Sequence, residues 1–173
     1  MTANRRNGGT QRGFSMIEVL ISLVLIAVAM LGQAGLQANA LRFSKSGSLR
    51  MQAVFLSNEM AERMEGNKAG AIAGNYVIGS ASSTVLTSAT DCMAAPCSSS
   101  VLAAYDLAEW TTRVSAVLPS ATWQITQTTT GNPSTYSVVI TWQDRRADST
   151  RTTYSTTGTT ETFTVTTSRV IYQ

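Results

Sequence analysis

The stretch GFSMIEVLISLVLIAVAML, residues 13–31, decides the fold of this chain. After the glycine, only Ser15, Glu18 and Ser22 are polar in it. With the less apolar continuation to Leu41, it is long enough to span a bilayer as one helix. Basic residues precede it and none lies within it, so we expect its N-terminal side to face the cytoplasm. Glu18 stands out, because an ionisable group at membrane depth costs about 2.5–3.5 kcal/mol and marks a functional position.

The helix is expected to extend well beyond a membrane. No proline occurs before Pro96, and apolar residues recur in 41–66 at spacings that place them on one helical face. These residues are Leu49, Ala53, Leu56, Met60 and Met64. The charged residues of the segment are expected mostly on the other side; they include Arg50, Glu59, Glu62, Arg63 and Glu65. We predict one helix from Phe14 to about Glu65, with a stop at Gly66 and a length of about 75–80 Å.

The remainder of the chain predicts a small antiparallel sheet. Residues 101–110 indicate a short helix that continues to Leu118, where Pro119 ends it. From residue 122 onward, apolar and polar residues alternate with period two. The alternation predicts strands at 122–126, 136–142 and 163–171, and a weaker fourth strand within 75–86.

Such a sheet has one apolar and one Thr-rich face, and the apolar face needs a cover. The only long candidate is the apolar face of 41–66, so four of its residues are expected to pack on the sheet: Leu49, Leu56, Met60 and Met64. The fold class is therefore α+β.

Composition restricts the classes of function. The chain is 43% hydrophobic and 13% charged, which is too apolar for a disordered protein. It has no histidine, the commonest general base and metal ligand, and only two cysteines. We therefore expect no metal, no cofactor and no enzymatic activity. Three of the thirteen basic residues, Arg5, Arg6 and Arg12, precede Phe14, and the rest balance the ten acidic ones. A nucleic-acid partner is not expected.

The arrangement of Gly13, Phe14 and Glu18 before an apolar helix resembles the class III prepilin signal of type IV pilins and type II secretion pseudopilins. The resemblance implies cleavage after Gly13 by prepilin peptidase and N-methylation of the new N-terminal Phe14. It also implies a role of Glu18 in subunit assembly.

The resemblance gives an expected organisation and location. Residues 1–13 would be a cytoplasmic leader and 14–40 the transmembrane and filament-core half of the helix. Residues 41–66 would be its amphipathic half, and 67–173 a periplasmic globular domain. The protein would cross the inner membrane once and later enter an extracellular pilus.

Cleavage after Gly13 would also supply a partner for Glu18. The free amine of Phe14 is a cation, and it can pair with Glu18 of a neighbouring subunit inside an apolar bundle. Since removing two charges from water is costly, this pair is expected to set the register of subunits more than to add stability.

The two cysteines, Cys92 and Cys97, are separated by four residues. Outside the cytoplasm, two cysteines this close are expected to form a structural disulfide that fixes a local turn. Two free thiols and a redox pair are the alternatives, although a redox pair usually has two intervening residues.

A second resemblance is to the PilV group of minor pilins. It rests on a cysteine, then Asp106-Leu-x-x-Trp110, Leu118-Pro119, and a strand that ends in WQDRR, residues 142–146. It implies a minor pilin that primes pilus assembly in a complex near the filament tip. The implied partners are other minor pilins, the major pilin, prepilin peptidase, the inner-membrane assembly platform and a tip adhesin. The acids Asp106 and Glu109 are three residues apart, and we interpret them as an exposed helical face rather than an acid–base pair.

Other interpretations remain open. A minor pseudopilin of a type II secretion system would carry the same signal. An ordinary signal peptide cut after Ala38-Asn39-Ala40 would release a secreted binding module, and a plain single-span anchor is a third possibility. Neither of the last two explains Glu18. The Ser/Thr-rich segment 149–168 suits an adhesive or glycosylated face, or simply a solvated sheet surface.

Overall fold

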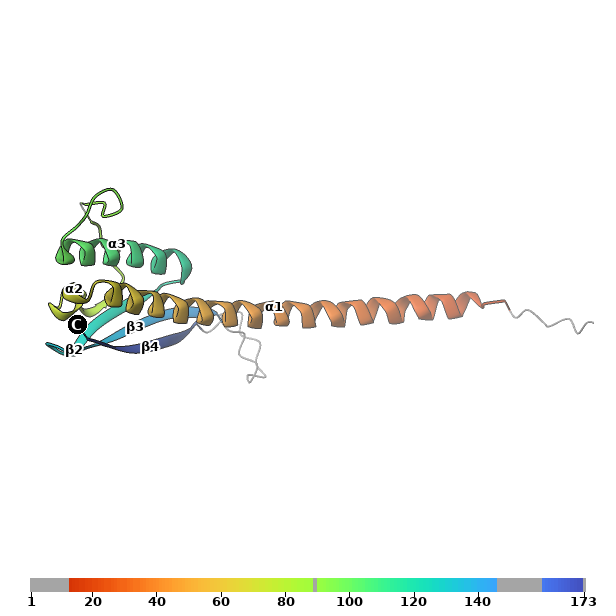
Figure 1. Cartoon of the computed structure of the whole chain (residues 1–173). Helices are drawn as coiled ribbons and strands as arrows, with labels where there is room; N and C mark the ends of the chain where they lie inside the picture. The colour runs from red at the N-terminus through yellow and green to blue at the C-terminus, as the bar shows by residue number, and fades with distance from the viewer. Residues whose placement is uncertain (1–12, 89, 146–159, 173) are drawn as a thin grey trace, which may run out of the picture. The chain divides into compact units, whose positions relative to one another are not determined.

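A computed structural model describes residues 13–88, 90–145 and 160–172. Along the chain, the helices are α1 (Met16–Gly66), α2 (Lys68–Ile72) and α3 (Ser99–Val117). The strands are β1 (Ile78–Ser82), β2 (Thr122–Thr129), β3 (Ser134–Arg145) and β4 (Thr160–Ile171). Figure 1 shows these elements coloured along the chain. A long N-terminal helix with a small antiparallel sheet confirms the predicted α+β class.

The long helix α1 has the predicted extent, 51 residues that end at Gly66. Contacts within the chain divide it between Leu41 and Arg42 into two compact units, each of which contains part of α1. Unit 1 contains the apolar part of α1, and unit 2 contains everything from Arg42 onward. Each unit is described below by itself.

The short helix α2 was not predicted, because its sequence KAGAI has too few residues to show a period. Asn67 caps it with a side chain that accepts a hydrogen bond from the Gly70 amide, at 3.2 Å. The Asn67 amide also donates to the carbonyl of Ser99, at 2.7 Å. A Cβ on Gly70 would come within 2.8 Å of that carbonyl, so glycine is required there by the close approach of α2 to α3.

The sheet is a meander in the order β1-β2-β3-β4, antiparallel throughout. The predicted fourth strand within 75–86 is β1, which forms one edge. On β3 the buried residues alternate as the period-two pattern predicted: Tyr136, Val138, Ile140 and Trp142. The opposite face is rich in threonine, and the hydroxyls of Thr141 and Thr164 lie 3.1 Å apart across β3 and β4.

The core of unit 2 lies between the sheet and two helices. Leu49, Leu56, Met60 and Met64 of α1 are all buried, in one cluster with the inward side chains of β2 and β3.

The expectation that α1 is the only long cover was wrong, because α3 contributes to the same cluster. Its buried apolar residues are Ala103, Leu107, Ala108, Trp110 and Val114. Trp110 donates from Nε1 to the carbonyl of Leu56 at 2.8 Å, and its ring meets that of Trp123 edge-on with centroids 6.4 Å apart. Figure 1 shows α3 beside the unit 2 part of α1.

Candidate assembly segment and supporting network

Unit 1 consists, in its described part, of an apolar helix with nothing packed on it. An 18-residue window of α1 has a mean hydropathy of 2.4 and none of it is buried. By length and composition, this helix could cross a membrane. The exposed side chains include Phe14, Ile17, Leu20, Leu23 and Leu25. A surface of this kind requires lipid or other helices, because apolar area in water is unfavourable in proportion to its size.

Glu18 lies in the first turn of α1. Its backbone amide donates to the carbonyl of Ser15 at 3.0 Å, and its own carbonyl accepts from the hydroxyl of Ser22 at 2.7 Å. The carboxylate forms no hydrogen bond or ion pair with any group in residues 13–88, 90–145 or 160–172. A negative charge is favourable at a helix N-terminus, by about 0.3–1 kcal/mol. That is less than the cost of burying the charge in an apolar bundle, so a buried Glu18 would need a cation.

Gly13 and Phe14 precede the helix and are exposed. No heavy atom lies within 4 Å of a Cβ built on Gly13, so packing among the described residues does not require glycine there. The side chain of Phe14 is 83% exposed. Packing among the described residues therefore gives no reason for this Gly-Phe pair.

In unit 2, the structure brings together a set of charged residues that lie far apart in the sequence. Arg63 of α1 forms three ion pairs: with Glu59 at 3.0 Å, with Asp106 at 2.9 Å and with Glu109 at 3.0 Å. Arg113 also contacts Glu59, at 2.9 Å. We call these five residues the α1–α3 ion cluster.

The ion cluster corrects two expectations. The acids of α3 are not a solvated face, because Asp106 is buried and Glu109 is partly buried, and both bind Arg63. Arg63 and Glu59 do not face solvent on the far side of α1, because both are partly buried against α3. The signal available in the sequence was the i,i+4 spacing of Glu59 and Arg63, which does not reveal a partner 43 residues away.

The ion cluster changes the acidity of its members. The hydrogen bond from Arg63 holds the pKa of Glu109 below its usual range. Burial alone would lower the pKa of Arg63, but its hydrogen bonds to Glu109, Glu59 and Asp106 outweigh burial and raise it.

Two further buried groups complete this polar network. The hydroxyl of Tyr76 donates to Asp106 at 2.6 Å and accepts from Asn67 at 3.1 Å. Burial and then the Asp106 bond raise the pKa of Tyr76. The network therefore links α1, the segment after α2 and α3, and sequence patterns alone did not indicate it.

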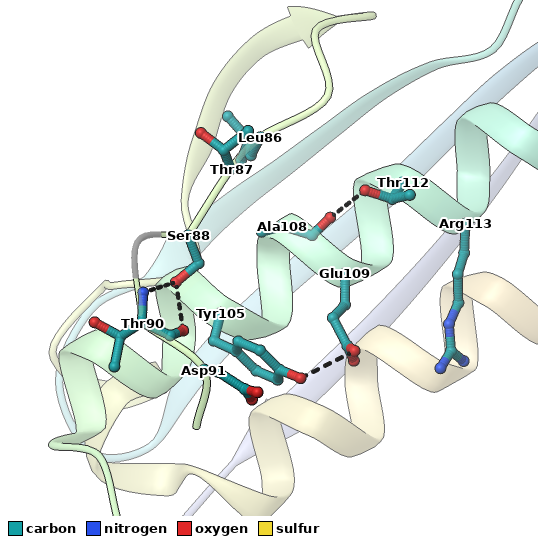
Figure 2. A pocket seen from close by; sticks show the side chains of 10 residues that line it. All are labelled: Leu86, Thr87, Ser88, Thr90, Asp91, Tyr105, Ala108, Glu109, Thr112 and Arg113. Carbon is teal, nitrogen blue, oxygen red and sulfur yellow. Dashed lines mark hydrogen bonds between the residues drawn. The ribbon is translucent and has the colours of Figure 1, made fainter. Parts of the chain in front are cut away.

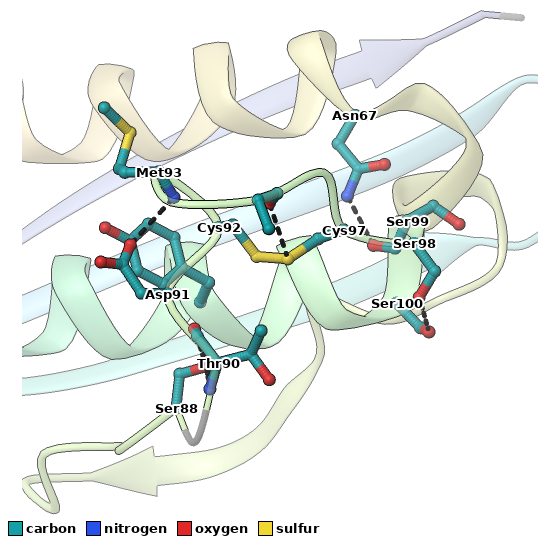
Figure 3. The surroundings of a disulfide bond; sticks show 12 residues. Asn67, Ser88, Thr90, Asp91, Cys92, Met93, Cys97, Ser98, Ser99 and Ser100 are labelled. Atoms are coloured by element: carbon teal, nitrogen blue, oxygen red, sulfur yellow. Dashed lines mark hydrogen bonds between the residues drawn. A yellow bond between two sulfur atoms is a disulfide. The ribbon is translucent and has the colours of Figure 1, made fainter.

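Cys92 and Cys97 form a disulfide, as predicted. Figure 3 shows it in the loop that leads into α3, where Asp91 accepts a hydrogen bond from the amide of Met93 at 2.9 Å. The side chain of Met93 is 84% exposed, so the bridge shapes a surface turn rather than the core. The loop is short, and its closure stabilises the fold at the low end of the range for disulfides.

A hollow of about 550 Å³ lies between residues 86–88 and 90–91 on one side and α3 on the other (Figure 2). Tyr105 and Glu109 on its wall are already hydrogen-bonded to each other at 3.1 Å. Within the described part of the chain, no group of three or more His, Cys, Asp or Glu side chains is placed to hold a metal ion.

Most residues on which the PilV resemblance rests can be placed in the structure. Trp110, Leu118 and Trp142 are all buried. The ring of Trp142 stacks on Phe163 with centroids 5.8 Å apart, and Arg50 lies over the same Phe163 ring at 5.3 Å. Trp110, Leu118 and Trp142 therefore belong to the hydrophobic core. Core residues of this kind do not by themselves distinguish a pilus subunit from a secretion-system subunit. Arg146 and most of the Ser/Thr-rich segment 149–168 lie outside the described residues.

An apolar N-terminal helix, a Gly-Phe junction and a small antiparallel sheet together define a pilin-like protein. Comparison with family models points to the same class of protein. Residues 35–108 match a family described as Type IV pilin Tt1218, and residues 9–32 match the prokaryotic N-terminal methylation motif. The two matches support the type IV pilin superfamily as the family of this chain, and neither distinguishes the PilV group. Comparisons with curated proteins and with solved structures gave no match.

Proposed function

We propose that this protein is a minor type IV pilin. Prepilin peptidase cuts it after Gly13, Phe14 is methylated, and the mature subunit enters the pilus through the apolar part of α1. One observation carries the proposal: an unburied apolar helix begins at Met16, just after the Gly-Phe junction, and contains Glu18, whose carboxylate has no partner among the described residues.

In this proposal residues 14–40 first anchor the subunit in the inner membrane and then join the filament core. Residues 41–66 and the periplasmic domain, 67–173, form the part that stays outside the lipid. The new amine of Phe14 pairs with Glu18 of a neighbouring subunit, which removes the cost of an isolated carboxylate in an apolar bundle. The pair selects the register in which subunits can enter.

The resemblance to the PilV group supports a place in a minor-pilin complex near the tip, next to an adhesin. The match to a type IV pilin family over residues 35–108 favours a pilus over a type II secretion machine, although both use the same signal.

Two measurements on the full chain, produced in a pilus-forming bacterium, test the proposal. Mass spectrometry should find methyl-Phe14 at the mature N-terminus; Leu41 at that position would show an ordinary signal peptide instead. Glu18→Ala should insert and be processed normally but be absent from sheared filaments. The matched control is Glu65→Ala on the same helix, which removes only an exposed pair with Lys68. Normal incorporation of Glu18→Ala would exclude the pairing role.

A further inference from the structure

The hollow that α3 forms with residues 86–88 and 90–91 has no part in the proposed function. Its volume of about 550 Å³ falls within the range of about 300–1,000 Å³ that is usual for ligand sites. The apolar part of its lining consists of Leu86, Ala108 and the ring of Tyr105, which is partly exposed. The hollow therefore has the size of a binding site, and the chemistry of its wall decides which ligand fits it.

One charge on the wall of the hollow has no counter-ion among the described residues. Asp91 is exposed, and its carboxylate accepts one backbone hydrogen bond but forms no ion pair with a described residue. The other two charges on the wall are already neutralised. Glu109 pairs with Arg63 at 3.0 Å, and Arg113 pairs with Glu59 at 2.9 Å. The described wall therefore carries one uncompensated negative charge.

Asp91 lies beside an aromatic ring. Figure 2 shows its carboxylate next to the ring of Tyr105. The pKa of Tyr105 is raised, first by desolvation, then by its hydrogen bond to Glu109 and by the charges of Glu109 and Asp91. An aromatic face attracts a cation within about 6 Å, and a neighbouring carboxylate adds a charge-assisted hydrogen bond. This end of the hollow thus favours a cation on an alkyl stem, since the stem can lie along the apolar lining.

We propose that the hollow binds an arginine side chain carried by a peptide segment of a partner protein. A guanidinium can stack on the ring of Tyr105 and bind the Asp91 carboxylate through two N–H groups at once, which an ammonium cannot do. Thr87 and Thr90 also line the hollow, and their hydroxyls form no hydrogen bond with a described residue. The backbone on either side of the arginine would supply amide and carbonyl groups for these hydroxyls, whereas a small free amine would not. The inference does not rest on the proposed function, because it uses only residues of unit 2.

The test is an NMR titration of the full chain in a non-ionic detergent, with carbon-13 in the tyrosine rings. The signal of Tyr105 is assigned from its loss in Tyr105→Phe. The probe is the peptide acetyl-glycyl-arginyl-glycinamide, and the control peptide has citrulline, which has nearly the same shape but no charge, in place of arginine. We expect the arginine peptide to shift the Tyr105 signal with a Kd of about 1 mM, as suits a single side chain in an open site. The citrulline peptide should bind at least about threefold more weakly.

A matched pair of variants tests the role of the carboxylate. Asp91→Asn removes the charge of an exposed side chain and keeps its shape, so folding should be retained and the Kd should rise about two- to fivefold. Glu62→Gln is the control, because Glu62 is also exposed and has no ion pair among the described residues. It should leave the Kd unchanged.

Three results would overturn the inference. They are the absence of a saturable shift of the Tyr105 signal, equal affinity for the arginine and citrulline peptides, and equal losses of affinity in Asp91→Asn and Glu62→Gln. Putrescine is titrated as well, and binding as tight as that of the arginine peptide would show a site for small amines instead of a peptide. A mature N-terminus other than Phe14 would refute the proposed function and leave this titration unaffected.

Discussion

Replacing Arg63 by methionine should destabilise unit 2 more than any other single change in the ion cluster. Methionine keeps most of the side-chain volume, so the effect is electrostatic. Asp106 would keep only its hydrogen bond from Tyr76, and Glu109 only that from Tyr105. Removing one partner of a fully buried ion pair costs about 3–5 kcal/mol. Because the side chains of Asp106 and Glu109 are 11% and 39% exposed, we expect about 2–4 kcal/mol.

The assay is thermal unfolding of the full chain in detergent, followed by circular dichroism. For a chain of this size, the expected loss lowers Tm by about 5–15 °C. Arg113→Met is the matched control, because Arg113 is 55% exposed and, among the described residues, forms an ion pair with Glu59 alone. It should cost less than about 1 kcal/mol. Equal losses for the two variants would refute the reasoning that burial makes Arg63 the centre of the cluster.

A double-mutant cycle separates the pair from general damage. Asp106→Asn removes the charge that Arg63 neutralises but keeps a similar shape. The double variant should lose less stability than the sum of the single losses, because its two changes remove both halves of one interaction. Strict additivity would mean that Arg63 and Asp106 do not interact energetically.

Three further predictions concern pH, a buried hydroxyl and the disulfide. Because the folded-state pKa of Glu109 is lowered, its contribution to stability is present above its ordinary pKa and is lost as pH falls through the folded value. Glu109→Gln should flatten that part of the acid unfolding curve. An unchanged curve would contradict this prediction. Tyr136 donates to the carbonyl of Ala71 at 2.6 Å, and burial raises its pKa to about 12. Tyr136→Phe should cost about 0.5–1.5 kcal/mol in urea unfolding, because it removes one hydrogen bond from a carbonyl that still accepts the Gly74 amide at 3.0 Å, and no loss would show that water replaces the hydroxyl. Cys92 and Cys97 should resist alkylation until the protein is reduced, and labelling without reductant would show free thiols. Replacing both cysteines by alanine should lower the free energy of unfolding by about 2 kcal/mol or less.

Much of the fold follows from local pattern. The extent of α1 could be predicted because its apolar run, its helical spacing and Gly66 all agree. The strand β3 could be predicted because Tyr136 and Trp142 belong to one period-two series. In both cases the information lies within a few residues of the feature it predicts.

The polar network could not be predicted in the same way. Asp106 and Glu109 look like a solvated pair in sequence, since charged residues are seldom buried without a partner. Their partner, Arg63, belongs to another helix, and nothing local to α3 indicates it. The same holds for α3 as a second cover of the sheet, because the contact of Trp110 with Trp123 forms only once both helices are in place.

The sequence by itself determined the N-terminal part of this protein. The apolar run specifies an apolar helix through local chemistry alone, and together with the Gly-Phe junction and Glu18 it predicts processing. Only the tertiary structure decided which charges are buried and which apolar side chains are not. Burial depends on what the rest of the chain places against a residue, so folding sets Arg63 among three carboxylates and leaves Met51, Val54 and Phe55 uncovered.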